Sequence, residues 1–303
     1  MSTFDNEEAT GRSSSSPSSR KGSASSAEAS TTSIISLFSD GDEDDANSSG
    51  TSLPSDKGSP VPLRRKRMPL RDRIVRHFGH SLSPEKPYLS YYDVLLTLED
   101  VKSLKNDWLT DNNIAFWEEY LERETLPKFP QARIVLLRPS MTFLLMKEPD
   151  QRAIRAALPD FSKVTHIFMP INDNRNVSVA EGGSHWSLLV VSALDGKAFH
   201  YDSLGGANYH EAKLATTKMS HILKRRLDFE NLRDAPQQEN GSDCGVFVCI
   251  IMRHLLVKRL LSANAREKVS MSMGGKMVDS NGGRKEMLAI IENLREEGER
   301  RRS

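Results

Sequence analysis

The segment from 244 to 261 constrains this chain most, because it is apolar on almost every side of a helical wheel. A helix at the surface keeps a polar face, so a helix without one has to be surrounded by other elements. We therefore predict a central buried helix that begins at Cys244, inside a domain large enough to cover it. Its apolar side chains are Val246, Phe247, Val248, Ile250, Ile251, Leu255 and Leu256.

The strands expected beside this helix lie upstream of it. Residues 164–171 and 186–192 are largely apolar runs, and the second has the continuity of a strand buried on both faces. A turn centred on Asp195-Gly196 leads into a returning run at 198–201, so an antiparallel hairpin is predicted. Helical patterns flank the hairpin, and this mixture of elements predicts an α+β domain. The helical patterns span 112–124, 208–226 and 284–301.

A cysteine stands at the predicted start of the buried helix, after a polar run at 236–243 that is rich in turn-forming residues. The first turn of a helix carries free N–H groups and the positive end of the dipole, and both stabilise a thiolate. Gly245 is expected to let a substrate backbone approach at this point. Cys244 is therefore the candidate nucleophile, whereas Cys249 is expected to be an inert buried side chain.

The predicted hairpin supplies the other groups that a thiol nucleophile needs. His185 directly precedes its first strand and Asp202 directly follows its second, so both should lie at one end of it. We expect His185 to accept the thiol proton and Asp202 to orient the imidazole ring. Gln238 would donate an amide N–H to the developing oxyanion. The turn comes slightly late for direct opposition of His185 and Asp202, so a bulge or a longer loop is expected.

These segments resemble the ubiquitin-like-protein-specific cysteine proteases of the Ulp/sentrin-protease type. His185-Trp186, 201–203 and 238–245 carry this resemblance, and 89–93 and 108–111 are similar to the deneddylase branch, as is 171–190. The similarity extends over about residues 87–300. It implies a papain-like fold, with Cys244 on the central helix and His185 and Asp202 on an antiparallel sheet. It also implies cleavage after the C-terminal Gly-Gly of a Nedd-type modifier, in its precursor and in conjugates such as those of cullins.

The resemblance further implies a substrate tunnel. In this family, tryptophans at the positions of Trp108 and Trp186 close a narrow passage over the diglycine. From the residues alone, both could instead be plain core aromatics. Asp111 would help to select the Nedd-type modifier. Thr110 departs from the family pattern, which usually has Asn there. Because residues with side chains cannot pass where Gly-Gly can, such a tunnel would account for specificity.

Two other functions remain open at this point. The same groups would serve a protease for SUMO or another modifier. A catalytically silent module would only bind a modifier, although the complete set of Cys244, His185, Asp202 and Gln238 argues against it. No cofactor, metal site or disulfide scaffold is expected, because the two cysteines lie five residues apart on one helix. The protein is expected to act as a monomer.

The first 80 residues differ in composition from the rest. Residues 1–60 contain nineteen serines and no Trp or Tyr, with ten Asp and Glu against four Lys and Arg. Such a segment buries too little apolar surface to fold, so we predict a disordered tail over 1–80 and a protease domain over 81–303. Ile34, Ile35 and Leu37 precede an acidic run and could add as a strand to a SUMO-type partner. The alternative is a chance apolar cluster in a low-complexity tail.

The charge of the tail changes sign at its end. Residues 61–80 hold seven Lys and Arg against one Asp, and the run at 64–67 is typical of a nuclear import signal or of a solvated basic linker. We expect a protein of the nucleus and cytoplasm. The whole-chain charge of +1 does not favour nucleic acid as a main partner. Membrane association is not expected either, because no secretory signal or membrane-spanning run is recognisable.

Overall fold

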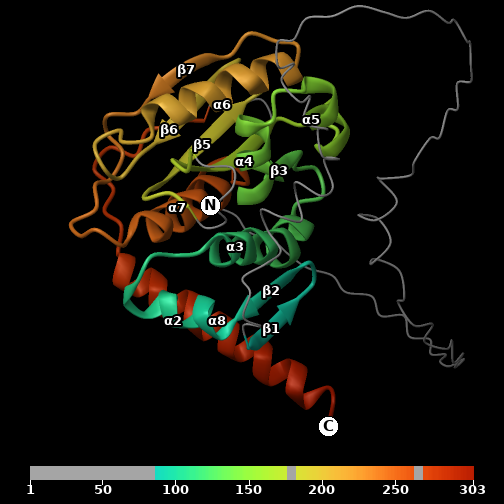
Figure 1. Cartoon of the computed structure of the whole chain (residues 1–303), viewed down its shortest axis with the longest axis vertical. Helices are drawn as coiled ribbons and strands as arrows, with labels where there is room; N and C mark the ends of the chain where they lie inside the picture. Colours follow the sequence, from blue (N-terminus) through green and yellow to red (C-terminus); the bar gives the residue numbers. More distant parts are fainter. Residues whose placement is uncertain (1–85, 176–181, 263–268) are drawn as a thin grey trace, which may run out of the picture. The chain divides into compact units, whose positions relative to one another are not determined.

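The structure is a computed structural model that describes residues 86–175, 182–262 and 269–303. Several predictions lie outside these residues: the disordered tail over 1–80, the apolar motif at Ile34, Ile35 and Leu37, and the basic run at 64–67. The described residues form an α+β fold in which helices cover a central sheet (Figure 1). The predicted fold class is therefore confirmed.

The central sheet has five strands in the order β3-β4-β5-β6-β7. The prediction of an antiparallel sheet holds for β4, β5 and β6 but is wrong for the edges, where β3 runs parallel to β4 and β7 runs parallel to β6. Each parallel pair is joined by a helical crossover, as parallel strands require. The strands are β3 (Ile134–Leu136), β4 (His166–Asn172), β5 (Trp186–Ser192), β6 (Lys197–Tyr201) and β7 (Asp228–Asn231).

Helices lie on both faces of this sheet (Figure 1). One face packs against α4 and α6 in an apolar cluster that includes Met169 and Leu189. The other face packs against α7 in a second cluster that includes Phe168 and Leu188. Successive side chains of a strand point to opposite faces, so the inner strands have to be apolar at every position. The helices are α4 (Pro139–Lys147), α5 (Gln151–Ala157), α6 (Tyr209–Ile222) and α7 (Cys244–Arg253).

A second layer covers the side of α7 that faces away from the sheet. There α3 and α8 both contact α7, and α2 and the first hairpin pack against α8 (Figure 1). This arrangement confirms the prediction that the apolar helix is central and buried. The elements of this layer are β1 (Pro87–Tyr91), β2 (Val94–Thr97), α2 (Leu98–Asn106), α3 (Asp111–Glu124), the short 3₁₀ helix η1 (Leu126–Lys128) and α8 (Ser280–Arg300).

Some boundaries differ from the prediction for local reasons. The buried helix continues from α7 as a π-helical segment, η2 (His254–Leu260). Helix α6 ends at Ile222 instead of residue 226, because Lys224 adopts a φ of 50° and turns the chain toward β7. Helix α8 begins four residues earlier than predicted, since the Asp279 side chain caps it by accepting the N–H of Gly282 at 2.8 Å.

Candidate active site

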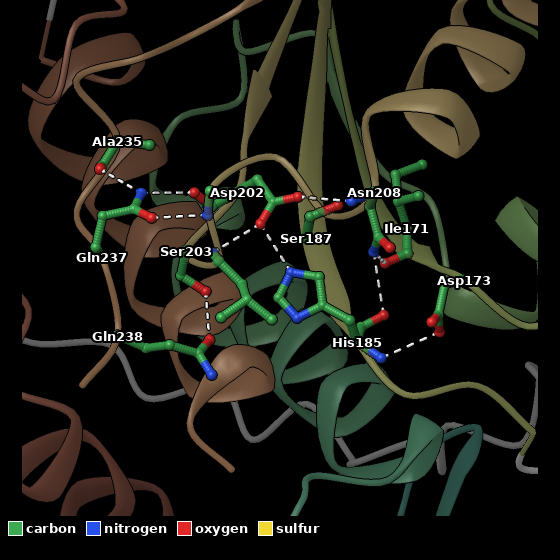
Figure 2. Close-up of polar contacts among 12 residues, drawn as sticks. Ile171, Asp173, His185, Ser187, Asp202, Ser203, Asn208, Ala235, Gln237 and Gln238 are labelled. Carbon is green, nitrogen blue, oxygen red and sulfur yellow. Dashed lines mark hydrogen bonds and ion pairs between the residues drawn. The ribbon is translucent and has the colours of Figure 1, made fainter. Parts of the chain in front are cut away.

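The hairpin of β5 and β6 brings His185 and Asp202 together. Its pairing runs without interruption from Ser192 opposite Lys197 to Leu188 opposite Tyr201, so the longer loop occurs and the bulge does not. In this register residue 204 would lie opposite His185, so Asp202 lies two residues short of direct opposition. The histidine side chain nevertheless reaches across, and its Nε2 lies 2.8 Å from Asp202 Oδ1 (Figure 2).

Backbone N–H groups hold the buried Asp202 carboxylate in place. Its Oδ1 also accepts the N–H of Leu204 at 2.8 Å, and its Oδ2 accepts the N–H of Asn208 at 2.8 Å. Burial raises the pKa of Asp202, but these bonds and the His185 ring outweigh burial and hold the pKa below its ordinary value. The carboxylate is therefore charged and fully engaged in orienting its neighbours.

Two residues that the sequence analysis missed hold the backbone around His185. Asp173 accepts the N–H of His185 at 3.0 Å, and it also binds Ser184. Asn208 donates from its side chain to the carbonyl oxygens of His185 (3.1 Å) and Ile171 (3.2 Å), as Figure 2 shows. Asp173 could have been recognised as a polar residue directly after a buried strand. Asn208 lies at the start of the helix expected over 208–226 and has no separate signal in the sequence.

Cys244 is the first residue of α7, as predicted, and its side chain is buried. Burial lowers the pKa of His185, but its hydrogen bonds to Asp202 and Cys244, together with their charges, outweigh burial and raise it to about 9. Because Nε2 faces Asp202, Nδ1 is the ring nitrogen left for the sulfur. The ring is thus held between a carboxylate and the Cys244 sulfur, and its raised pKa favours the imidazolium that forms when the ring takes the thiol proton.

Gln238 lies in the turn that leads to Cys244. Its Oε1 accepts the hydroxyl of Ser203 at 2.7 Å, and its Nε2 donates to the Asn240 carbonyl at 2.7 Å. The Gln238 side-chain amide has a second N–H, and the predicted hydrogen bond to the oxyanion would use it. The adjacent Gln237, which the sequence analysis did not single out, donates to the Asp202 carbonyl at 2.9 Å. This glutamine therefore fixes the strand end that carries the carboxylate.

The Trp108-Leu109 segment packs directly on the start of α7. The Trp186 side chain is 6% exposed and donates its indole N–H to the Leu109 carbonyl at 3.2 Å, while Trp108 is 44% exposed. A Cβ at Gly245 would lie 2.8 Å from the Leu109 Cβ. The prediction that Gly245 makes room for a substrate backbone is therefore corrected, because Leu109 occupies that space. The tunnel itself stays a prediction.

Thr110 and Asp111 connect this segment to α3. Thr110 is the N-cap of α3, where its hydroxyl accepts the Asn113 N–H at 3.2 Å and donates to Asp100 of α2 at 2.5 Å. A threonine therefore fulfils a capping role at the position where the family usually has Asn. Asp111 is the half-buried first residue of α3, next to the tryptophan segment. Its predicted part in modifier selection stays a prediction.

His200 and Cys249 are further buried groups that the proposed site does not use. His200 is buried between Asn231 and Ser187, with ring nitrogens 2.7 Å and 2.9 Å from their side-chain oxygens, and burial lowers its pKa. Burial raises the pKa of the Cys249 thiol well above its ordinary value, as expected for an inert cysteine. Within the described ranges, no cluster of three or more His, Cys, Asp or Glu is suited to a metal ion, and no helix could span a membrane.

Comparisons with known proteins agree with this geometry. Residues 107–279 match the family described as the Ulp1 protease family, C-terminal catalytic domain. NEDD8-specific protease 2 of Schizosaccharomyces pombe is 36% identical over 230 residues, covering 72% of this chain and 55% of that protein. NEDD8-specific protease 1 of the same yeast is 37% identical over 187 residues, covering 59% and 44%. The chain therefore spans about half the length of these relatives.

A solved structure shows the same fold. The C-terminal Ulp1 protease domain, in complex with Smt3, the yeast orthologue of SUMO, superposes with a TM-score of 0.52. It is 20% identical in sequence, and the match covers 78% of this chain and 99% of that one. The likeness supports the papain-like α+β architecture expected from the sequence.

Proposed function

The chain belongs to the Ulp1 protease family, and from this premise we propose that it is a cysteine-type isopeptidase and endopeptidase specific for a Nedd-type modifier. The buried pair of His185 and Asp202 beside Cys244 carries the proposal. These three residues supply the base, the carboxylate that orients it and the nucleophile. The modifier class is supported by the NEDD8-specific proteases among the relatives. The substrates are the modifier precursor and modifier conjugates such as those of cullins.

The reaction begins at the thiol. The proton of Cys244 passes to Nδ1 of His185, and the raised pKa of His185, about 9, favours this imidazolium form. The thiolate attacks the carbonyl carbon of the last glycine of the modifier, and a tetrahedral oxyanion forms. His185 then donates its proton to the leaving amine, which is a lysine Nζ in a conjugate or the next backbone nitrogen in a precursor. The products of this half-reaction are a free amine and a thioester on Cys244.

The second half-reaction releases the modifier. His185, now neutral, takes a proton from a water molecule that attacks the thioester carbonyl. The thiolate leaves, and the modifier departs with a C-terminal carboxylate. Through both steps the N–H of Cys244 and the amide of Gln238 donate to the oxyanion, while Asp202 keeps the ring in its orientation.

Specificity for diglycine would come from the tryptophan segment. Trp108 and Trp186 flank the entrance to Cys244, and Asp111 contacts the modifier near the same entrance. A passage walled by two indoles admits glycine and rejects larger residues by steric exclusion. The hydrogen bond from Trp186 to Leu109 supports this arrangement, because it fixes one wall to the segment that carries the other.

A panel of modifiers that carry C-terminal electrophilic traps tests the proposal. We expect the protein to form a covalent adduct with the Nedd-type probe faster than with SUMO or ubiquitin probes, as followed by intact mass. Cys244→Ala should form none, whereas the matched variant Cys249→Ala should label normally. Preferential labelling by the SUMO probe would replace the proposal with a SUMO-specific protease. Binding of modifiers without any adduct would support the silent binding module.

A further inference from the structure

Helix α8 lies beyond the segment that matches the family, yet it reaches the turn that carries the nucleophile. The family match ends at residue 279, and α8 spans Ser280–Arg300. Its Gly283 faces α7, where an added Cβ would lie 2.5 Å from Cδ1 and 3.1 Å from Cγ1 of Ile250. The glycine therefore lets the two helices approach closely at this point. The next residue, Arg284, is buried even though it carries a charge.

The guanidinium of Arg284 binds two separate segments of the chain. On one side, Nε and Nη2 donate to Asp243 Oδ1 at 2.9 Å and 2.7 Å, and Nη2 also lies 3.0 Å from the Ser242 carbonyl. On the other side, Nη2 lies 2.8 Å from the carbonyl of Asp107. Nη1 adds bonds of 3.1 Å and 3.3 Å to the carbonyls of Ser103 and Leu104.

These two segments are the two sides of the proposed active site. Ser242 and Asp243 directly precede Cys244, and Asp107 directly precedes Trp108. Ser103 and Leu104 belong to the last turn of α2, where carbonyl oxygens favour a cation, and the Ser103 carbonyl also accepts the N–H of Asp107 at 2.9 Å. One buried side chain therefore sets the position of the nucleophile turn relative to the tryptophan segment. A planar fork with five N–H donors suits this role, whereas an ammonium group cannot make all these bonds at once.

We propose that Arg284 is a positioning residue that holds the nucleophile turn and the tryptophan segment in register for cleavage of the modifier. This inference rests on the proposed function, since the register matters only if the modifier C-terminus has to lie between the two segments. Arg284 does not touch the substrate. Arg284 fixes the distance between the sulfur of Cys244 and the tryptophan walls that align the scissile carbonyl. Catalysis is sensitive to such distances.

A comparison of Arg284→Gln with Arg284→Lys tests the proposal in the full chain. We expect Arg284→Gln to lower kcat for a diglycine-ended modifier by about 100-fold at a temperature where the variant is folded, with KM changed much less. Arg284→Lys keeps the charge but not the fork, so it should recover only part of the rate. The matched control is Arg253→Gln, since Arg253 also joins α7 to α8, through Glu286, but stays clear of the nucleophile turn.

Hydrogen exchange gives a second readout that does not depend on activity. We expect faster amide exchange in 107–110 and 242–247 of Arg284→Gln, whereas Arg253→Gln should leave both segments protected. Normal kcat in folded Arg284→Gln, or equal exchange in the two variants, would overturn the positioning role. If the wild-type chain labels with no modifier probe, the proposed function fails, and exchange alone then decides whether Arg284 joins the two segments.

Discussion

At the residue scale, the central question is how His185 can be both buried and charged. Burial alone lowers the pKa of a histidine, because a low-dielectric environment disfavours the imidazolium. Here the bonds to Asp202 and Cys244 reverse that effect and raise the pKa to about 9. Asp202 can do this because the bond from His185 and two backbone N–H groups outweigh its own burial and hold its pKa low, so it stays a carboxylate. The charge on the ring is thus favoured by a carboxylate that three hydrogen bonds hold in place.

This electrostatic arrangement predicts the alkaline limb of the pH profile. We expect kcat/KM to fall as the pH rises through about 9, because His185 then loses the proton that it donates to the leaving amine. The raised pKa also means that the pair stabilises the fold fully below pH 6.5, the ordinary histidine value, and that this stability is lost as the pH rises through about 9. Both effects have the same sign, so activity and melting temperature should decline together.

Replacing the carboxylate tests the cause of the shift. In Asp202→Asn the opposite charge is gone, so the alkaline limb should move to lower pH by about 1 to 3 units, with a lower maximal rate. The exposed Asp228 provides a control, because Asp228→Asn removes the same charge far from the ring and should leave the limb in place. An alkaline limb that stays near 9 in Asp202→Asn would show that Asp202 does not determine the pKa of His185.

At the element scale, the elements with strong periodicity were predictable, and the contacts between elements were not. The bounds of β5 and the start of α7 agree with the sequence, because an apolar run and a helix-start cysteine are local signals. Helix α2 was missed, although Thr97 and Asp100 form a capping box that the sequence contains. The parallel edges of the sheet depend on which helices cross over, and neighbouring residues do not encode this.

The same division applies to the candidate site. His185, Asp202 and Cys244 were predicted from their places at the ends of elements, and the structure brings them together. The partners that hold them were not predicted. Asn208, Gln237 and Arg284 act through bonds to backbone atoms that are distant in sequence, and such bonds leave no pattern in a single chain.

The contact between Gly245 and Leu109 leads to a prediction about two elements. In Gly245→Ala the new Cβ would lie 2.8 Å from Leu109 Cβ and 3.2 Å from Cγ, so α7 and the tryptophan segment have to move apart. Overpacking costs about 1–3 kcal/mol, more than the gain of up to about 1 kcal/mol from replacing a helical glycine. We expect a lower melting temperature and slower labelling by the modifier trap.

A glycine in the turn that precedes α7 provides the matched control for this variant. Gly241 has open space where a Cβ would be, so Gly241→Ala should keep both the melting temperature and the labelling rate. If the two variants behave alike, the close approach of Leu109 is not what requires glycine at position 245. The space beside Cys244 would then again be available to a substrate backbone, as the sequence first suggested.

At the scale of the whole molecule, the family match and the folding unit have different ends. The match covers 107–279, but α8 continues the core beyond it, with Met287 and Ile291 buried in the cluster that surrounds α7. At the other end, the hairpin of β1 and β2 precedes the match and contributes Leu89 and Leu96 to the same cluster. The structure therefore indicates that the catalytic unit is larger than the family segment at both ends.

Trimmed proteins test where this unit ends. We expect residues 81–303 to melt cooperatively and to label with the modifier trap at the full-length rate, because the tail predicted at 1–80 is too polar to add to the core. Removal of α8, leaving 81–279, should abolish cooperative melting. Each large apolar side chain withdrawn from the core costs about 1.5–3 kcal/mol, and the whole free energy of unfolding of a domain is only about 5–15 kcal/mol.

Melting followed by circular dichroism, with trap labelling on the same samples, distinguishes the outcomes. An insoluble or inactive 81–303 protein would show that the tail belongs to the folded unit, and a cooperative, active 81–279 protein would show that α8 is dispensable.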